Sequence, residues 1–281
     1  MLEYTKERQQ KIREASKDVL REFIRICEKH DLTYFVSFGT AIGIVRHGGF
    51  VPWDDDIDVV MLRKDYDKFV EIAKDEIGEK FGLYGAALQD GAQGFFLRLY
   101  KKGTTFTTKY NKKWKYHPGI WMDIIPYDCV PDDLKERKAY YKKLRRISQM
   151  YIIRNVKYPY MSGNSITTIL TRVACIVAYY VMKVFGPSTQ KLIKQYTELQ
   201  VKYEGKTKNR TMLDYYTPDK WIINDDEIFP LQDAMFEDIK VKLPAKNHEI
   251  LTRCYGDYMT PPPVEKQVGH ELLDVGFDDE D

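Results

Sequence analysis

The chain has 281 residues, enough for one large domain or for a catalytic domain with a helical addition. Hydrophobic residues make up 43% and charged residues 31%, a globular composition that excludes wholesale disorder. The formal net charge is only +2, so no global field favours nucleic acid as a partner, and any recognition of anions must be local.

The four cysteines are far apart in the sequence and form no CxxC pair. This spacing is typical of buried small hydrophobes in a reducing compartment, and it excludes a zinc site or a disulfide framework. The first twenty residues are charged and helical in pattern, unlike a signal peptide. We therefore expect a cytoplasmic protein, with contact to the inner face of the membrane as the alternative.

Apolar periodicity and β-branched runs predict helices and strands that alternate along the first half of the chain. In chain order the expected elements are a helix over 5–30, a strand over 33–38, a short helix over 40–46, a strand over 57–61, a helix over 64–77, and strands near 95–100, 104–109 and 120–125. This order favours an α/β core.

Beyond Pro131 the pattern becomes helical and basic. Turn residues at 157–165 mark the boundary that we predict between the core and a helical region. The predicted domains are a core over 1–156, a helical region over 157–210, and a segment over 211–281 that packs back on the core and ends in a mobile acidic tail. The later elements are expected to be helices over 166–185 and 187–204, a strand near 234–242, and a helix over 244–255.

The segment 166–185 is rich in apolar residues but includes Arg172 and Lys183. Its uninterrupted apolar run, 173–182, is about half of the roughly 20 residues that a membrane span needs. We interpret the segment as a buried helix. Peripheral contact with a membrane surface is the alternative.

The most informative block is VPWDDDID, residues 51–58. In an extended chain alternate side chains share a face, so Asp54, Asp56 and Asp58 should project together while Ile57 and Val59 face the core. Carboxylates crowded on one face repel one another unless a cation lies between them. Oxygen ligands of this kind suit Mg²⁺ or Mn²⁺, which in turn holds substrate phosphates.

The same D-x-D-x-D spacing also opens a calcium-binding EF-hand loop, which needs Gly at the sixth position and Glu at the twelfth. Val59 and Asp65 occupy those positions, so the calcium loop is excluded. A further acid is expected from 119–128, where Asp123 lies among apolar residues. An unpaired carboxylate there would cost several kcal/mol of desolvation, so Asp123 needs a metal or a cationic partner.

Gly39 and Thr40 follow a predicted strand and open a predicted helix. Backbone N–H groups at a helix start can bind phosphate, and the Thr40 hydroxyl can add a hydrogen bond. Arg46 and His47 can supply positive charge to the same phosphates, although His47 equally fits a plain surface residue. Residues 101–115 contain six Lys and no acid, which fits either a solvated loop or a collar for a polyanion or an anionic surface.

These motifs, in this order, resemble the LicD family, which includes bacterial phosphocholine transferases and is similar to fukutin-type transferases. The matching residues are Gly39-Thr40, Arg46, the block 51–58, Trp121-Met122-Asp123-Ile124, Phe236-Glu237-Asp238, Tyr255-Gly256-Asp257-Tyr258 and His270. The resemblance implies a nucleotidyltransferase-like fold, in which a mixed sheet is flanked by helices. It also implies metal ligands at Asp56, Asp58 and Asp123, with Asp54 as a further candidate, and a phosphate-binding turn at Gly39-Thr40.

The resemblance further implies a CDP-linked donor such as CDP-choline, from which a phospho-alcohol passes to a hydroxyl of a cell-surface or lipid-linked glycan while CMP is released. We hypothesise that Asp123 orients or deprotonates the acceptor hydroxyl and that Arg98 and Lys101 hold the remaining phosphate oxygens. A choline head group would bind aromatic faces. The candidates for those faces are Trp114, Tyr116 and Trp121.

Three other functions fit parts of the same sequence. A nucleotidyltransferase would move a nucleotide to a small molecule and release pyrophosphate. A non-catalytic glycan- or nucleotide-binding protein would not need all three acids. The apolar segment 166–185 and the lysine-rich loop would also fit a membrane-associated scaffold.

Overall fold

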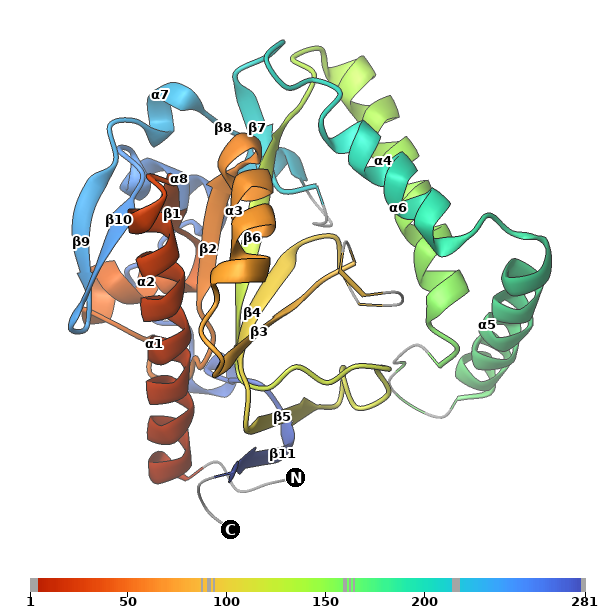
Figure 1. Cartoon of the computed structure of the whole chain (residues 1–281), viewed down its shortest axis with the longest axis horizontal. Helices are drawn as coiled ribbons and strands as arrows, with labels where there is room; N and C mark the ends of the chain where they lie inside the picture. The colour runs from red at the N-terminus through yellow and green to blue at the C-terminus, as the bar shows by residue number, and fades with distance from the viewer. Residues whose placement is uncertain are drawn as a thin grey trace.

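The computed structural model describes residues 5–86, 88–89, 92, 94–158, 161, 163, 165–213 and 218–278. A mixed sheet crosses the middle of the molecule and helices flank it, which confirms the predicted fold class (Figure 1). The main strands are, in sheet order, β1 (Tyr34–Val36), β2 (Asp58–Leu62), β6 (Trp121–Cys129), β4 (Leu97–Lys101) and β3 (Phe81–Tyr84). The sheet is extended by β7 (Asn209–Thr211), which pairs with β6, and by β8 (Ile223–Asn224).

The register of the central strands determines which polar side chains meet. β2 and β6 run parallel and set Asp58 opposite Asp123, whereas β4 runs antiparallel to β6 and sets Arg98 opposite Asp123. Residues that oppose one another on neighbouring strands point to the same face of a sheet. The two acids and the arginine therefore share one face.

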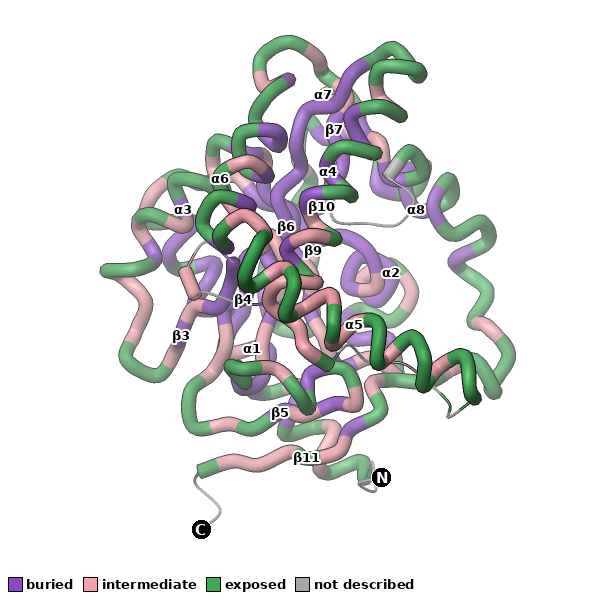
Figure 2. Tube along the Cα trace, turned by 90° about the vertical axis from the view of Figure 1, so that its right-hand side faces the viewer, coloured by how far each residue is buried: buried purple, intermediate pink, exposed green. Residues whose placement is uncertain are grey.

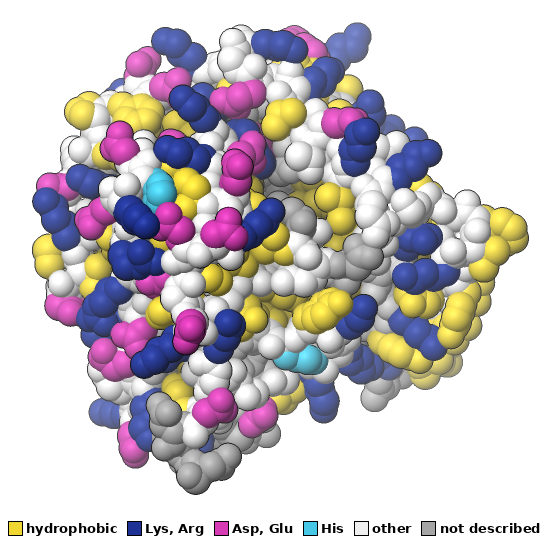
Figure 3. All heavy atoms as spheres, in the orientation of Figure 1, with side chains coloured by type: hydrophobic (Ala, Val, Ile, Leu, Met, Phe, Trp, Pro, Cys, Tyr) yellow, Lys and Arg dark blue, Asp and Glu magenta, His cyan; other side chains and the backbone are white. Residues whose placement is uncertain are grey.

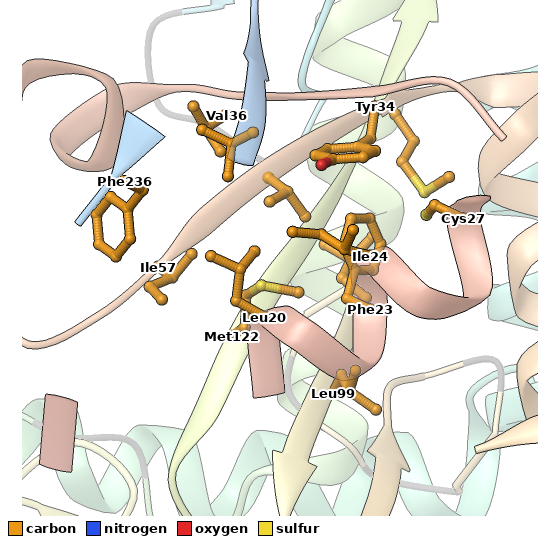
Figure 4. Close-up of a cluster of buried hydrophobic side chains, with 14 of the residues drawn as sticks. Leu20, Phe23, Ile24, Cys27, Tyr34, Val36, Ile57, Leu99, Met122 and Phe236 are labelled. Carbon is orange, nitrogen blue, oxygen red and sulfur yellow. The ribbon is translucent and has the colours of Figure 1, made fainter. Parts of the chain in front are cut away.

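The other face of the sheet packs against α1 (Lys6–Lys29) and α3 (Arg63–Glu76). α1 begins after Thr5, whose side chain accepts a hydrogen bond from the backbone N–H of Arg8 at 3.2 Å. Figure 4 shows the resulting core, in which apolar side chains of α1 meet those of the strands. Among its members are Leu20, Phe23, Val36, Ile57, Leu99 and Met122.

The face that carries the acids is covered elsewhere by the C-terminal third of the chain. Phe35, Ile125 and Tyr127 point to this face and pack against Trp221 and against α8 (Asn247–Tyr255). The alternation of strand residues between the two cores is the period of two that an extended chain requires. Burial on both faces fixes the register of β2 and β6, because a shift by one residue would turn every acid into the α1 core.

A tyrosine-rich core holds the helical part together. α4 (Leu134–Asn155) and α6 (Thr189–Gln200) pack through Tyr140, Tyr151 and Tyr196. α5 (Ile166–Phe185) lies at the edge of the molecule against α4 and has no buried residue (Figure 2).

The interpretation of 166–185 as a buried helix is therefore wrong. Apolar residues lie on two sides of α5, and only the side that meets α4 is half-buried. The apolar composition of a helix indicates how much apolar surface could be buried. It does not indicate whether the fold places a second element against that surface.

Two further differences from the predicted elements concern strands. The expected strand near 234–242 is a hairpin of β9 (Gln232–Phe236) and β10 (Ile239–Leu243), whose turn includes Glu237 with φ +52°. The sequence also did not predict β11 (Leu272–Phe277), which pairs with β5 (Thr104–Thr108). Of the expected mobile acidic tail, 279–281 lies outside the described residues.

The remaining predicted elements occur close to their expected bounds. The sequence also did not predict the short strands β3, β7 and β8, nor the short helices η1 (Pro218–Trp221), α7 (Asp225–Ile228) and η2 (Val264–Lys266).

Candidate active site

The site begins where β1 leads into α2 (Phe38–His47). Ser37, the N-cap of α2, makes no capping hydrogen bond with its side chain, so the first backbone N–H groups of the helix are not used by that residue. Thr40 is buried, and its Oγ1 accepts a hydrogen bond from the backbone N–H of Asp58 at 2.9 Å. The helix start and the first residue of β2 are thereby fixed to each other.

The block 54–58 alternates as predicted. Asp55 and Ile57 are buried, whereas Asp54, Asp56 and Asp58 are partly accessible on the other side of the chain. Three acidic side chains are therefore crowded on one side of a single extended segment.

The pKa values of these acids show how closely they are crowded. Desolvation raises the pKa of Asp54 to about 8, and the charge of Asp56 adds to that effect. Desolvation also raises the pKa of Asp56. It raises the pKa of Asp58 strongly, and the charges of Asp56 and Asp123 raise that pKa further. Each carboxylate thus raises the energy of the others, as like charges do when water is excluded.

Asp123 receives its positive partner from the neighbouring strand β4. The Nε of Arg98 donates to Oδ1 of Asp123 at 2.7 Å, and both side chains are largely buried. Four aromatic rings lie with their centroids 5.0–5.8 Å from the guanidinium carbon, those of Tyr84, Phe96, Trp114 and Trp121. Such rings attract a cation through their quadrupoles, so they position Arg98 toward Asp123.

The aromatic residues suggested for choline therefore have different surroundings from those expected. Trp114 and Trp121 contact a cation of the chain itself. Tyr116 is exposed, and Nζ of Lys115 lies 5.0 Å from its ring centroid.

Asp55 faces away from the other acids and has its own partner. Oδ1 of Asp55 lies 2.6 Å from Nδ1 of His270, and this hydrogen bond, together with the charges of the aspartates, raises the pKa of His270 to about 9. A Cβ atom at Gly269 would lie 2.4 Å from the backbone oxygen of Trp53, so only glycine permits this approach. The C-terminal segment therefore holds the acidic loop from one side.

α1 holds the same loop from another side. Arg13 donates from Nη2 to the backbone oxygens of Val51, Pro52 and Asp54 at 2.8, 3.0 and 3.0 Å. The Nε2 of Gln9 adds a hydrogen bond to the oxygen of Pro52 at 2.9 Å. Sequence reasoning missed Arg13, because nothing in an amphipathic helix indicates which of its polar residues meets a loop some forty positions away.

The motif Phe236-Glu237-Asp238 braces the connection between α2 and β2. Phe236 packs edge-on against Phe50 with ring centroids 4.7 Å apart. The backbone N–H of Glu237 donates to the oxygen of Gly48 at 2.7 Å, and its carboxylate pairs with Lys17 at 2.9 Å. These contacts assign the motif a supporting position at the back of the loop.

Two clefts meet at Trp53 and Asp54. A cleft of about 410 Å³ is lined by Gly39, Arg46 and the 255–260 segment. A second cleft of about 730 Å³ is lined by Lys109, Tyr110 and His270. Asp54, at the edge of the acidic centre, is thus accessible from two sides.

The basic residues suggested for phosphate binding differ in where they lie. Nη1 of Arg46 donates to the oxygen of Tyr258 at 2.8 Å in the smaller cleft, and its Nε donates to the exposed His47 at 2.8 Å. Lys101 pairs with Asp18 of α1 at 2.7 Å, on the opposite face of β4 from Arg98. The structure therefore brings Arg98 and Arg46 to the site and does not bring Lys101.

Among the described residues, no three His, Cys, Asp or Glu side chains already enclose a position for a metal ion. Asp54 and Asp56 instead lie close enough that each alters the pKa of the other. The donors still have the chemistry that Mg²⁺ prefers, since they are carboxylate oxygens whose mutual repulsion a divalent cation would relieve. The side chains that could hold such an ion are those of Asp56, Asp58 and Asp123, with Asp54 beside them.

A mixed sheet with acids on neighbouring strands, beside a helix that starts at a Gly-Thr pair, is the nucleotidyltransferase-like arrangement that the motifs imply. Residues 31–157 match the family described as LicD/FKTN/FKRP, nucleotidyltransferase domain. The part of the chain that carries the acids thus matches a nucleotidyltransferase domain of the LicD family. Arg13 and His270 lie outside the matched residues.

The named relatives align with most of the chain or with part of it. The chain is 29% identical to the lipopolysaccharide cholinephosphotransferase LicD of Haemophilus influenzae over 263 residues, which cover 92% of this chain and 94% of that protein. It is 22% identical over 107 residues to the ribitol 5-phosphate transferase FKRP of Homo sapiens and of Mus musculus, covering 38% of this chain and 20% of those proteins. The named relatives are thus transferases of phosphorylated groups.

Proposed function

We propose that this chain is a metal-dependent phosphotransferase. In this proposal it moves a phospho-alcohol, phosphocholine first among the candidates, from a CDP-linked donor to a hydroxyl of a cell-surface glycan or of its lipid-linked precursor. The observation that carries the proposal is the meeting of Asp56 and Asp58 with Asp123 of the neighbouring strand, beside the helix start at Gly39. The name of the Haemophilus influenzae relative supports phosphocholine, and that of FKRP supports the wider class of phospho-alcohols.

The proposed roles follow from position. Asp56, Asp58 and Asp123 would hold Mg²⁺ or Mn²⁺, with Asp54 as a neighbour, and the bound ion would neutralise charge on the donor diphosphate. The backbone N–H groups at Gly39 and Thr40 suit a phosphate, because the start of a helix carries partial positive charge. Arg98, already held beside Asp123, would donate to a further phosphate oxygen.

In the transfer itself, the acceptor oxygen forms a bond to phosphorus as the bond from phosphorus to CMP breaks. The acceptor hydroxyl must lose its proton, and Asp123 is the proposed group that receives it. The two clefts that meet at Asp54 would allow donor and acceptor to approach from separate sides.

The proposal is tested by incubating the purified chain with Mg²⁺ and CDP-choline, CDP-ethanolamine, CDP-glycerol or CDP-ribitol and measuring CMP. Asp58→Asn should reduce metal-dependent CMP release by about 10²-fold or more, because one negative ligand is lost at the charge-stabilising centre. The variant should fold at least as stably as the parent, since it removes a carboxylate that the charges of Asp56 and Asp123 repel.

Asp75→Asn, on the exposed side of α3, is the matched control and should keep the parent rate. Unchanged turnover in Asp58→Asn would overturn the metal assignment. Release of pyrophosphate from nucleoside triphosphates, without CMP from any CDP-alcohol, would instead favour nucleotidyl transfer.

A further inference from the structure

The outer side of α5 is a continuous apolar surface. Eight of its large side chains are 49–77% exposed and recur at helical spacing: Ile166, Ile169, Leu170, Val173, Val177, Tyr180, Val181 and Val184. We call these eight residues the apolar stripe. Positions three and four apart lie above one another on a helix, so the stripe faces one direction, away from α4. Figure 3 shows apolar side chains as a band along the edge of the molecule where α5 lies.

Positive charge lies beside the apolar stripe. Residues 137–197 contain twelve Lys and Arg and no Asp or Glu, although the whole chain has a net charge of only +2. Nζ of Lys157 lies 2.7 Å from the hydroxyl of Tyr180 in the stripe. Lys113, from the lysine-rich loop, and Lys157 both lie over the ring of Tyr158, at 5.3 and 5.1 Å. The lysine-rich loop and α5 therefore belong to one surface.

We propose that α5 lies in the interface of an anionic lipid bilayer, with the apolar stripe toward the acyl chains and Lys113 and Lys157 at the head groups. An apolar helix face bordered by Lys and by Tyr at its edge is the pattern that such an interface binds. The charge excludes the other occupants. A second copy of the chain would bring the basic border of the stripe, Lys113 and Lys157, close to the same border of its partner, and nucleic acid would leave the stripe in water.

α5 is long and apolar enough to cross a membrane, yet its connections place it along the surface. The side chains of Asn155, at the end of α4, and Thr189, at the start of α6, are hydrogen-bonded at 3.0 Å. The end of α4 and the start of α6 therefore lie next to each other, and α5 is part of the segment that connects them. A crossing helix would draw the connection after Asn155, with Lys157, into the hydrocarbon, where a charged side chain is costly.

This surface does not depend on the chemistry proposed for the acids. It is tested by co-sedimentation of the full chain with vesicles of phosphatidylcholine alone and of phosphatidylcholine mixed with phosphatidylglycerol. The parent should bind the anionic vesicles at least tenfold more tightly, and added salt should weaken that binding.

Leu170→Glu combined with Val177→Glu should weaken binding to the anionic vesicles at least tenfold, because two charges would enter the stripe. Lys113→Gln and Lys157→Gln should each weaken it about fivefold, as expected for one basic side chain near a charged surface. The matched control is Met235→Glu with Val264→Glu, two exposed apolar residues away from α5, which should bind like the parent.

Circular dichroism should show unchanged helix content in the Leu170/Val177 variant, since both side chains are exposed. Asp58→Asn should bind vesicles like the parent, which separates this inference from the proposed reaction. The inference is overturned if the parent binds no vesicles, if it binds phosphatidylcholine equally well, or if the stripe variant binds unchanged. If light scattering shows that the parent protein is a dimer and that the Leu170/Val177 variant is a monomer, the stripe is instead an interface between two copies of the chain.

Discussion

At the scale of single residues, Gly39 shows how closely the backbone of a helix start approaches an acid. A Cβ atom at this position would lie 2.8 Å from Oδ2 of Asp54, closer than real Cβ atoms approach an oxygen. The absence of a side chain thus allows the carboxylate to lie directly against the first turn of α2. The sequence predicted Gly39 as a phosphate-binding position, but it gave no sign of this contact with Asp54.

Gly39→Ala should therefore separate stability from activity. Alanine stabilises a helix by about 1 kcal/mol relative to glycine, whereas the new Cβ atom must displace Asp54 at some cost. Because the first effect offsets the second, the free energy of unfolding should fall by no more than the cost of moving Asp54. Displacing that carboxylate by a fraction of an ångström to an ångström should reduce CMP release by about 10²-fold. Urea unfolding and the CDP-alcohol assay measure the two effects.

Gly276→Ala is the control for that substitution, because its Cβ would meet only Thr105, at an ordinary 3.7 Å. It should keep the parent activity. Full activity in Gly39→Ala would show that the position of Asp54 has no part in turnover.

His270 should carry a proton at neutral pH. Its hydrogen bond to Asp55 raises its pKa to about 9, whereas desolvation and the nearby Arg46 lower the pKa of the exposed His47 below the usual 6.5. In NMR titrations of the metal-free protein, the two ring signals should therefore move at opposite ends of the neutral range. Asp55→Asn should return the pKa of His270 toward 6.5.

The sign of the stability effect follows from the direction of the shift. A raised pKa means that the folded state binds the proton more tightly, so this stabilisation is fully present below pH 6.5 and is lost as the pH rises through about 9. In Asp55→Asn the free energy of unfolding should change less over that interval. A His270 signal that titrates below pH 7 in the parent protein would refute the pairing with Asp55.

At the scale of elements, a buried ion pair joins the sheet to the helical part. Nε and Nη2 of Arg63, at the start of α3, donate to both carboxylate oxygens of Asp128 in β6 at 2.6 and 2.9 Å. Gln200 of α6 adds a hydrogen bond to the same carboxylate at 3.2 Å. Three elements that are distant in the sequence thus depend on one acid that solvent does not reach.

Arg63→Met should lower the free energy of unfolding by about 3–5 kcal/mol, because it leaves Asp128 buried without its cation. Lys194→Met breaks an exposed pair with Glu198 and should cost about 0.5 kcal/mol or less. Urea denaturation compares the two variants. If both variants lost the same free energy of unfolding, the buried Arg63–Asp128 pair would contribute no more to stability than the exposed pair.

The sequence predicted most elements because their apolar spacing is local. Helix α1 and strand β2 are examples, since the period of their buried residues is visible in the chain itself. The hairpin of β9 and β10 was missed because its turn contains no Gly, Pro or Asn and depends on a positive φ at Glu237. The burial of α5 was misjudged because burial is decided by partners, and periodicity does not describe partners.

At the scale of the whole molecule, one part of the candidate site could be predicted from the sequence and another part could not. The alternation of Asp54, Asp56 and Asp58 could be predicted from five consecutive residues. The parts that hold them could not, because Arg13 and His270 reach the loop across 41 and 215 positions. Contacts over such separations leave no period in the sequence, so only the assembled fold reveals them.

The double anchoring of residues 54–56, by Arg13 before them and His270 long after them, also bears on synthesis of the chain. A ribosome makes His270 more than two hundred residues after the loop that it secures, so the hydrogen bond to Asp55 can form only after residue 270 has been made. Any product that stops short of that histidine leaves Asp55 buried without its partner. A chain that ends before His270 should therefore hold its acidic loop less firmly than the full chain does.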